Sequence, residues 1–135
     1  MSLNRFVEAQ APVYQRVLAE LHAGRKQSHW MWFVFPQIAG LGSSPMAQRY
    51  AIASLAEAKD YLADDLLARH LRECTETVLS HPDKTVHAIF GSPDDMKFHS
   101  SMTLFHRADP DDEAFRQALD IFFDGKEDQA TIARF

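Results

Sequence analysis

The sequence lacks several features that define common protein classes. It contains a single cysteine, Cys74, so an intrachain disulfide is excluded. The N-terminus, Met-Ser-Leu-Asn-Arg-Phe, does not begin with a charged region followed by an apolar run, so no signal peptide is indicated. We therefore expect a soluble, cytoplasmic protein with no membrane partner, in which Cys74 packs as a small apolar side chain.

Glycine-rich phosphate loops and basic clusters are also missing. Neither a Walker pattern nor G-x-G-x-x-G occurs, which argues against the common dinucleotide and nucleoside-triphosphate folds. Fourteen basic and nineteen acidic residues give a net charge of −5, which opposes the counterion release that drives nucleic-acid binding. We expect no nucleic-acid partner.

Metal-ligating residues do not form a tight cluster either. Asp95, His99 and His106 could share one face of a helix, but the two histidines are two turns apart. Zinc requires a closer set of ligands than this spacing provides. No metal site and no cofactor are predicted.

The sequence does contain a strong helical pattern. Its 46% hydrophobic and 24% charged residues are typical of an ordinary globular protein. Apolar side chains recur every three to four residues after Pro12, from Leu67 to Val78 and from Phe115 to Phe123, whereas alternating strand patterns are scarce. We predict an all-α fold, a compact bundle of about eight to ten helices, several of them short, in a single globular helical domain over residues 1–135.

Prolines, capping residues and glycines predict where helices begin and end. Three dipeptides place a capping side chain before a proline: Ser44-Pro45, Ser92-Pro93 and Asp109-Pro110. Helices are expected to start there. Ser54 followed by Glu57 predicts a capping box, and Gly24 and Gly125 are placed as C-caps.

The run from Trp30 to Phe35 is compatible with either a buried strand or a short buried helix. A lone strand would leave backbone groups without partners, so we predict a two-turn helix that begins near Ser28 and ends before Pro36. The Gly- and Ser-rich residues 37–44 are then expected to form the longest loop.

Residues 26–37 form the first candidate functional motif, in which aromatic rings are crowded beside polar side chains. In one interpretation, Trp30 and Trp32 stack on a planar ligand while Lys26 and Gln37 hold its polar groups. In the other, the rings are core residues. Both hold if one face of the segment packs inside and the other lines a pocket.

Residues 91–105 form the second motif, a capped helix whose apolar residues do not make one clean stripe, which predicts burial on several sides. Lys97 projects with Ser100 and Ser101, and Asp95 projects from roughly the opposite face. A largely buried lysine must be paired, so Lys97 either meets a carboxylate or awaits an anionic substrate. Asp95 is a helix-capping carboxylate or a catalytic base.

These segments carry a resemblance to a bacterial family. Residues 26–37, the stretch Ile89-Phe90-Gly91 through Asp95, and Ser100 to Phe105 resemble domain-of-unknown-function family 1810, whose members are often mislabelled calpastatin. The resemblance covers nearly the whole chain and implies a compact all-helical domain, but no reaction. The calpastatin label implies protease inhibition by a disordered chain, which conflicts with this aromatic-rich composition.

Two functional hypotheses follow. In the first, a pocket between residues 26–37 and 91–105 takes a nucleotide-like or phosphorylated metabolite, and the protein is a binder or a hydrolase-type enzyme. His29 or Asp95 acts as a base and Lys97 stabilises negative charge. The ligand-binding residues are Lys26, Trp30, Trp32, Gln37, Ser100 and Ser101.

In the second hypothesis, the same residues are structural, and the chain is a non-enzymatic protein-interaction module whose partner the sequence does not identify. A closed and fully hydrogen-bonded network would favour the module. An open pocket between the two motifs would favour the small-molecule ligand.

Overall fold

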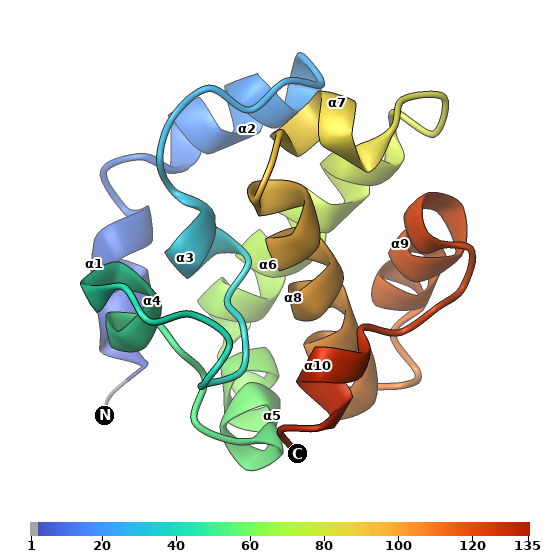
Figure 1. Cartoon of the computed structure of the whole chain (residues 1–135). Coiled ribbons are helices and arrows are strands. Elements are labelled where there is room, and N and C mark those ends of the chain that lie inside the picture. The colour runs from blue at the N-terminus through green and yellow to red at the C-terminus, as the bar shows by residue number, and fades with distance from the viewer. Residues whose placement is uncertain (1–2) are drawn as a thin grey trace.

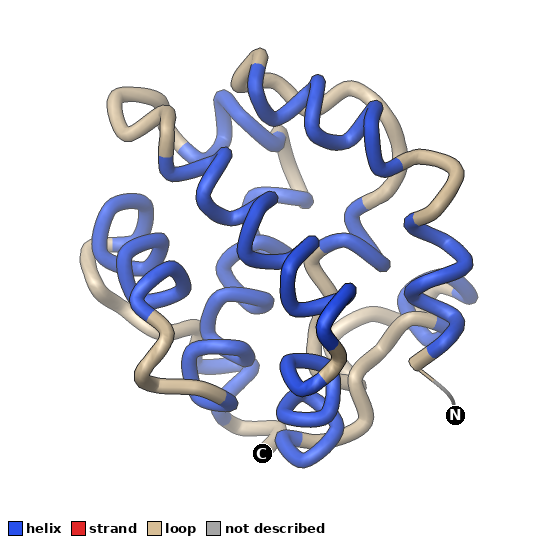
Figure 2. Tube along the Cα trace, turned by 180° about the vertical axis from the view of Figure 1, so that it is seen from behind, coloured by secondary structure: helices blue, strands red, loops and turns tan. Residues whose placement is uncertain are grey.

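The structure, a computed structural model, describes residues 3–135 and confirms the all-α prediction (Figure 1). Within those residues there are ten helices and no strand. The view from behind shows only helices joined by loops (Figure 2). The helices are α1 (Asn4–Gln10), α2 (Tyr14–His22), α3 (Met31–Val34), α4 (Pro45–Arg49), α5 (Leu55–Ala63), α6 (Asp65–Leu79), α7 (Val86–Phe90), α8 (Asp94–Ala108), α9 (Glu113–Phe123) and α10 (Gln129–Ile132). No helix in this described part is long and apolar enough to cross a membrane.

The long helix α8 is packed on several sides, as its apolar pattern predicted. It contacts α5, α7, α9 and α10 (Figure 1). Phe98 and every residue from Ser100 to Phe105 are buried. A helix with buried residues all round lies in the interior, so only the first turn of α8, His99 and the last turn reach the surface.

A cluster of phenylalanine rings joins the two sequence motifs. The ring centroids of Phe35 and Phe98 lie 5.0 Å apart, and those of Phe90 and Phe98 lie 4.7 Å apart. Pairs at these separations stabilise by roughly 1 kcal/mol beyond the area they bury. This cluster fixes the segment after α3 against α7 and α8.

Cys74 on α6 is fully buried, as predicted. Burial raises the pKa of its thiol to about 12. The thiol is therefore protonated at neutral pH and behaves as part of the core.

The segment from Trp30 to Phe35 contains a helix rather than a strand, but α3 is a single turn and starts later than predicted. The buried Gln10 amide donates to the carbonyl of Phe33 at 2.7 Å and so ties α3 to α1. Residues 37–44 form the expected loop. A parallel bridge between Ile38 and Ile52 closes it, with the Ile52 N–H donating to the Gln37 carbonyl at 2.8 Å.

Some predicted helix ends are confirmed. Ser44 caps α4 by accepting from the Ala47 N–H, and Ser54 caps α5 by accepting from the Glu57 N–H, both at 3.1 Å. Gly24 and Gly125 follow α2 and α9 with φ of +72° and +74°, a backbone region that glycine enters without a Cβ penalty.

Two predicted helix starts need correction. Helix α8 begins at Asp94, one residue later than predicted, and Pro93 rather than Ser92 stands at its N-cap position, without a side-chain cap. The predicted start at Pro110 is wrong by three residues. Helix α9 begins at Glu113 because the later carboxylate, Asp112, accepts from the Ala114 N–H at 3.1 Å.

Glu20 on α2 holds the segment that precedes α3. Its largely buried carboxylate accepts hydrogen bonds from the Gln27 N–H at 2.8 Å, the Ser28 N–H at 2.9 Å and the Ser28 hydroxyl at 2.5 Å. It also accepts from the Trp30 indole N–H at 3.0 Å. The backbone of residues 27–28 is therefore held against α2 by a side chain, ahead of the first turn of α3.

These hydrogen bonds change the acidity of Glu20. Burial alone would raise its pKa, but the donors from Ser28, Gln27 and Trp30 outweigh burial and lower the pKa to about 2. Because the folded-state pKa lies below the ordinary 4.5, the stabilisation is complete above about pH 4.5 and is lost as the pH falls towards 2.

We predict that Glu20→Gln destabilises the fold at neutral pH by about 3 kcal/mol, because it removes the charge that the four donors stabilise. It should also flatten the fall in stability between about pH 4.5 and pH 2. Urea unfolding followed by circular dichroism across this range measures both effects. The control is Glu113→Gln, since the Glu113 side chain is 63% exposed. If the stability of Glu20→Gln fell between about pH 4.5 and pH 2 as steeply as that of the wild type, Glu20 would not be the group that causes this fall.

Candidate functional site

The two sequence motifs lie side by side in the structure. The Lys26 N–H donates to the Ile89 carbonyl at 2.7 Å, just before the second motif begins. The Lys26 ammonium lies 2.8 Å from a carboxylate oxygen of Asp94. Residues distant in sequence are thus brought together at the N-terminal end of α8.

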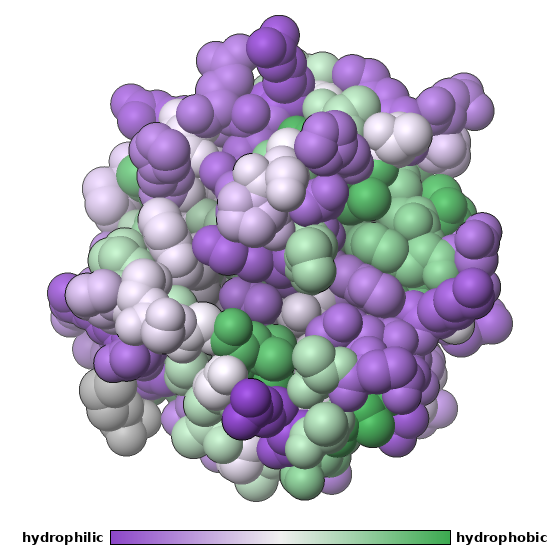
Figure 3. Space-filling view, viewed as in Figure 1, coloured by the Kyte–Doolittle hydropathy of each residue, from purple (hydrophilic) through white to green (hydrophobic). Residues whose placement is uncertain are grey.

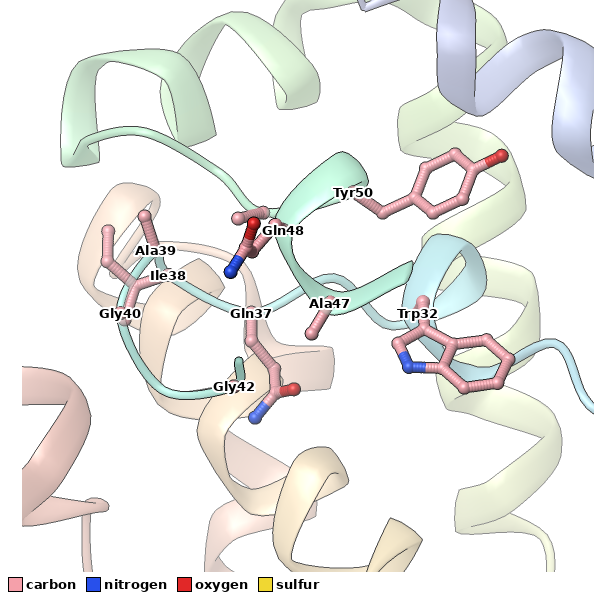
Figure 4. A pocket seen from close by; sticks show the side chains of 10 residues that line it. Trp32, Gln37, Ile38, Ala39, Gly40, Gly42, Ala47, Gln48 and Tyr50 are labelled. Carbon is pink, nitrogen blue, oxygen red and sulfur yellow. The ribbon is translucent and has the colours of Figure 1, made fainter. Parts of the chain in front are cut away.

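Three cavities adjoin this junction, and together we call them the cleft. The lysine cavity, of about 360 Å³, is lined by Lys26, Gln27, His29, Met31, Trp32, Phe90, Ser92, Pro93, Asp94 and Lys97. The tryptophan cavity, of about 140 Å³, is lined by Trp32, Gln37, Ile38, Ala39, Gly40, Gly42, Ala47, Gln48, Tyr50 and Ala51 (Figure 4). The α10 cavity, of about 470 Å³, is lined by Gln37, Leu41, Gly42, Ser43, Ser44, Ala47, Pro93, Met96, Lys97, His99, Ser100, Asp128 and Ala130.

Six residues each line two of the cavities, namely Trp32, Gln37, Gly42, Ala47, Pro93 and Lys97, and three of them carry N–H groups in their side chains. Trp32 borders the lysine and tryptophan cavities, and Gln37 borders the tryptophan and α10 cavities. Lys97 borders the lysine and α10 cavities. These three residues, all predicted from sequence, form the centre of the cleft.

Lys26 is already fully engaged. Its side chain is only 6% exposed, and its ammonium donates to the Ser28 carbonyl and pairs with Asp94. The same ammonium lies 5.0 Å from the centre of a Trp30 ring, a distance at which the cation is attracted to the ring face. Lys26 thus joins the loop before α3 to the first turn of α8.

Lys97 is held more loosely. Its ammonium lies 3.6 Å from the second Asp94 oxygen and 5.0 Å from the centre of a Trp32 ring. Within residues 3–135 it makes no hydrogen bond. The sequence left open whether Lys97 meets a carboxylate or awaits an anion. It does meet a carboxylate, but its N–H groups remain available to a ligand.

Trp32 and Gln37 are similarly open. In the described part of the chain, neither the Trp32 indole N–H nor the Gln37 side-chain amide has a hydrogen-bond partner. Figure 4 shows both side chains beside the tryptophan cavity, with Gln48 across it. The Gln48 amide donates to the Ser43 carbonyl at 3.0 Å, which leaves its oxygen able to accept.

His29 and Ser100 also line the cleft. His29 is exposed at the lysine cavity. Ser100 is 6% exposed and its hydroxyl contacts the Met96 carbonyl at 3.2 Å and Asp128 at 3.1 Å. The cleft therefore contains six of the nine residues predicted from sequence: Lys26, His29, Trp32, Gln37, Lys97 and Ser100.

Three predicted residues do not line the cleft. Trp30 is 1% exposed, and its indole N–H is bound to Glu20. Ser101 is completely buried, with no partner for its hydroxyl among the described residues. Asp95 accepts from His87 at 3.2 Å and from the Met96 N–H at 2.8 Å.

Sequence reasoning missed two carboxylates of the cleft. Asp94 appeared only as a helix-start acid, yet it bridges two lysines. Asp128 gave no signal except its place before a short helix, where it caps α10. With two lysines and one aspartate, the lysine cavity has a positive lining, opposite in sign to the whole chain.

Metal-ligating side chains do not form a cluster in the described part of the chain. Among residues 3–135, no three histidine, cysteine, aspartate or glutamate side chains are placed to hold a metal ion.

The comparisons with known proteins agree with the resemblance seen in the sequence. The family model described as "Protein of unknown function (DUF1810)" matches residues 1–135. A solved structure of the conserved hypothetical protein Rv1873 from Mycobacterium tuberculosis is 55% identical and superposes with a TM-score of 0.95, covering 97% of this chain and 94% of that one. No curated protein matches the chain.

We predict that the two lysines contribute differently to stability. Lys26→Met leaves the Asp94 carboxylate without its closer partner and should cost about 3 kcal/mol. Lys97→Met removes a longer and more exposed ion pair and should cost less than about 1 kcal/mol. Urea unfolding of both variants measures the difference. Equal losses would contradict the assignment of Lys26 as structural and Lys97 as available.

Proposed function

The chain belongs to the DUF1810 family of proteins of unknown function, and we propose that it binds a small anionic molecule in the cleft, a nucleotide-like or phosphorylated metabolite. The two larger cavities, of about 360 and 470 Å³, lie in the size range of small-molecule sites.

One observation carries this proposal. At the centre of the cleft, the Lys97 ammonium, the Gln37 amide and the Trp32 indole N–H all lack hydrogen-bond partners in the described chain. Their counterparts in the same motifs, Lys26 and Trp30, are bonded within the protein. Unpaired polar groups that converge on cavities favour a ligand over a purely structural role.

The chemistry of these groups supports an anionic ligand. All three offer N–H donors, and the ammonium adds a positive charge, so an acceptor-rich group such as phosphate or carboxylate complements them. The half-buried Trp32 ring offers an aromatic surface for a planar part of the ligand.

The alternative hypothesis, that the chain is a protein-interaction module, explains fewer of these contacts. It explains the closed contacts of Lys26 and Trp30, but not the open centre of the cleft. On the face shown in Figure 3, hydrophobic side chains are interspersed with hydrophilic ones. The exposed large hydrophobic residues in the described chain, Met96, Ile121 and Phe135, are few, whereas interaction surfaces expose contiguous apolar patches.

A hydrolase version of the proposal uses His29 as the base. His29 is exposed at the lysine cavity and has no side-chain hydrogen bond within residues 3–135. Histidine is the side chain that most often serves as a general base. Lys97 would stabilise negative charge that develops on the ligand, whereas Asp95 contacts His87 and lies outside the cavities.

We predict that nucleotides or phosphorylated metabolites raise the melting temperature of the wild type in a concentration-dependent way, because ligands that bind only the folded state stabilise it. Lys97→Met should weaken binding about tenfold or more, since a charge-assisted hydrogen bond is lost. A thermal-shift panel finds the ligand, and isothermal titration calorimetry measures its affinity.

The matched control is Lys59→Met, which removes an exposed lysine outside the three cavities. It should bind like the wild type. If no compound in the panel shifts the wild type, or if both lysine variants lose affinity equally, the cleft is not an anion-binding site.

A further inference from the structure

We infer that the ligand carries hydroxyl groups and that Asp128 accepts hydrogen bonds from them, which makes the ligand an anionic sugar such as a sugar phosphate. This inference rests on the proposed function and names the chemical class of the ligand. Asp128 lies outside both sequence motifs, and its place in the cleft is seen only in the folded chain.

Asp128 and Lys97 line the same α10 cavity. Ser100 connects them: it follows Lys97 by three residues on α8, and its hydroxyl lies 3.1 Å from an Asp128 oxygen. Residues three apart on a helix are neighbours on its surface. A ligand in this cavity therefore meets an ammonium at one end and a carboxylate about one helical turn further on.

The segment that carries Asp128 is fixed to α8 by successive contacts. His99 bonds the Lys126 carbonyl at 2.8 Å, and Arg107 contacts Glu127 through two nitrogens at 2.5 and 2.9 Å. The Asp128 N–H donates to the Thr103 hydroxyl at 2.9 Å. The carboxylate is thus presented from a rigid support, which limits the ordering cost of binding.

The two oxygens of Asp128 differ. Oδ2 accepts from the Ser100 hydroxyl, from the Thr131 N–H at 3.2 Å and from the Thr131 hydroxyl at 2.6 Å. Oδ1 accepts no hydrogen bond from residues 3–135. A carboxylate has about four acceptor positions, so one oxygen is used to hold the side chain and the other remains for a donor on a ligand.

Hydroxyl groups fit this oxygen better than an ammonium group does. Lys97 lies about one helical turn from Ser100 on α8, and its ammonium repels a second cation in the same cavity. A neutral hydroxyl group meets no such repulsion. The cavity also contains apolar side chains, among them Leu41, Ala47 and Met96, which suit the C–H faces of a sugar ring. An anionic group at Lys97 and hydroxyl groups at Asp128 together describe a sugar phosphate, whether free or within a nucleotide.

The test compares ribose 5-phosphate with pentyl phosphate, which has the same number of carbons but no hydroxyl groups, by calorimetry on the full chain. The wild type should bind ribose 5-phosphate about tenfold more tightly. Asp128→Asn should remove this preference and leave the affinity for pentyl phosphate within about twofold. Asparagine is a good N-cap, and with its oxygen at the Oδ2 position its NH₂ group replaces the open acceptor by a donor.

A second variant separates recognition from structure. Thr131→Val removes a donor to Oδ2 but leaves Oδ1 unchanged, so it should keep the preference for ribose 5-phosphate. If Thr131→Val loses the preference as fully as Asp128→Asn does, Asp128 acts only by holding α10, and the inference is overturned. Adenosine 5′-monophosphate is a further probe, and binding tighter than that of ribose 5-phosphate with the same Asp128 dependence supports a nucleotide as the ligand.

The outcomes also separate this inference from the proposed function. If both phosphates bind and Lys97→Met weakens both, but Asp128→Asn leaves their affinity ratio unchanged, the anion site stands and the sugar specificity is refuted. If none of the three probes binds to the wild type but another phosphorylated compound of the panel does, the sugar specificity is refuted and the anion site stands; if nothing in the panel binds, both proposals fail.

Discussion

The arrangement of the cleft depends on the carboxylate of Glu20. Burying a charge in the interior is costly unless hydrogen bonds compensate it, and here four donors from three residues do so. They fix the backbone at residues 27–28 and draw the Trp30 indole inward. The single turn of α3 that follows then directs Trp32 to the cavities, and three residues after its end the Gln37 carbonyl accepts from the Ile52 N–H. The interaction is structural, yet it positions the groups proposed to bind the ligand.

Across the two motifs, chemically similar side chains have different roles: one member of each pair is bonded inside the protein and the other faces the cleft. Trp30 is bonded inside, whereas the Trp32 indole is open. Lys26 and Lys97 share one carboxylate, but only Lys26 is held at hydrogen-bond distance. This division is compatible with both interpretations of the sequence, the structural one for Lys26 and Trp30 and the functional one for Trp32 and Lys97. In a dense polar and aromatic motif, adjacent residues therefore provide both the internal contacts that hold the segment and the side chains that line the cleft.

The sequence predicts what depends on neighbouring residues and fails where distant segments meet. Helical periodicity and the caps at Ser44 and Ser54 act within a few residues, so they were visible. The role of Asp94 was not visible, because its carboxylate pairs with Lys26, which lies 68 positions earlier. Asp128 was invisible for the same reason, since its contact with Ser100 spans 28 positions. Most of the predicted cleft residues do meet, but which of them are already bonded follows only from tertiary contacts.

The way Asp94 holds Lys97 has a kinetic consequence. The ammonium rests between a carboxylate and an indole face without a hydrogen bond to either, so an arriving anion has no short contact to break before it binds. The walls on both sides are fixed by hydrogen bonds to α2 and α8. Association of the proposed ligand would then need neither loop closure nor local unfolding, and residence time, rather than encounter rate, would separate good ligands from poor ones.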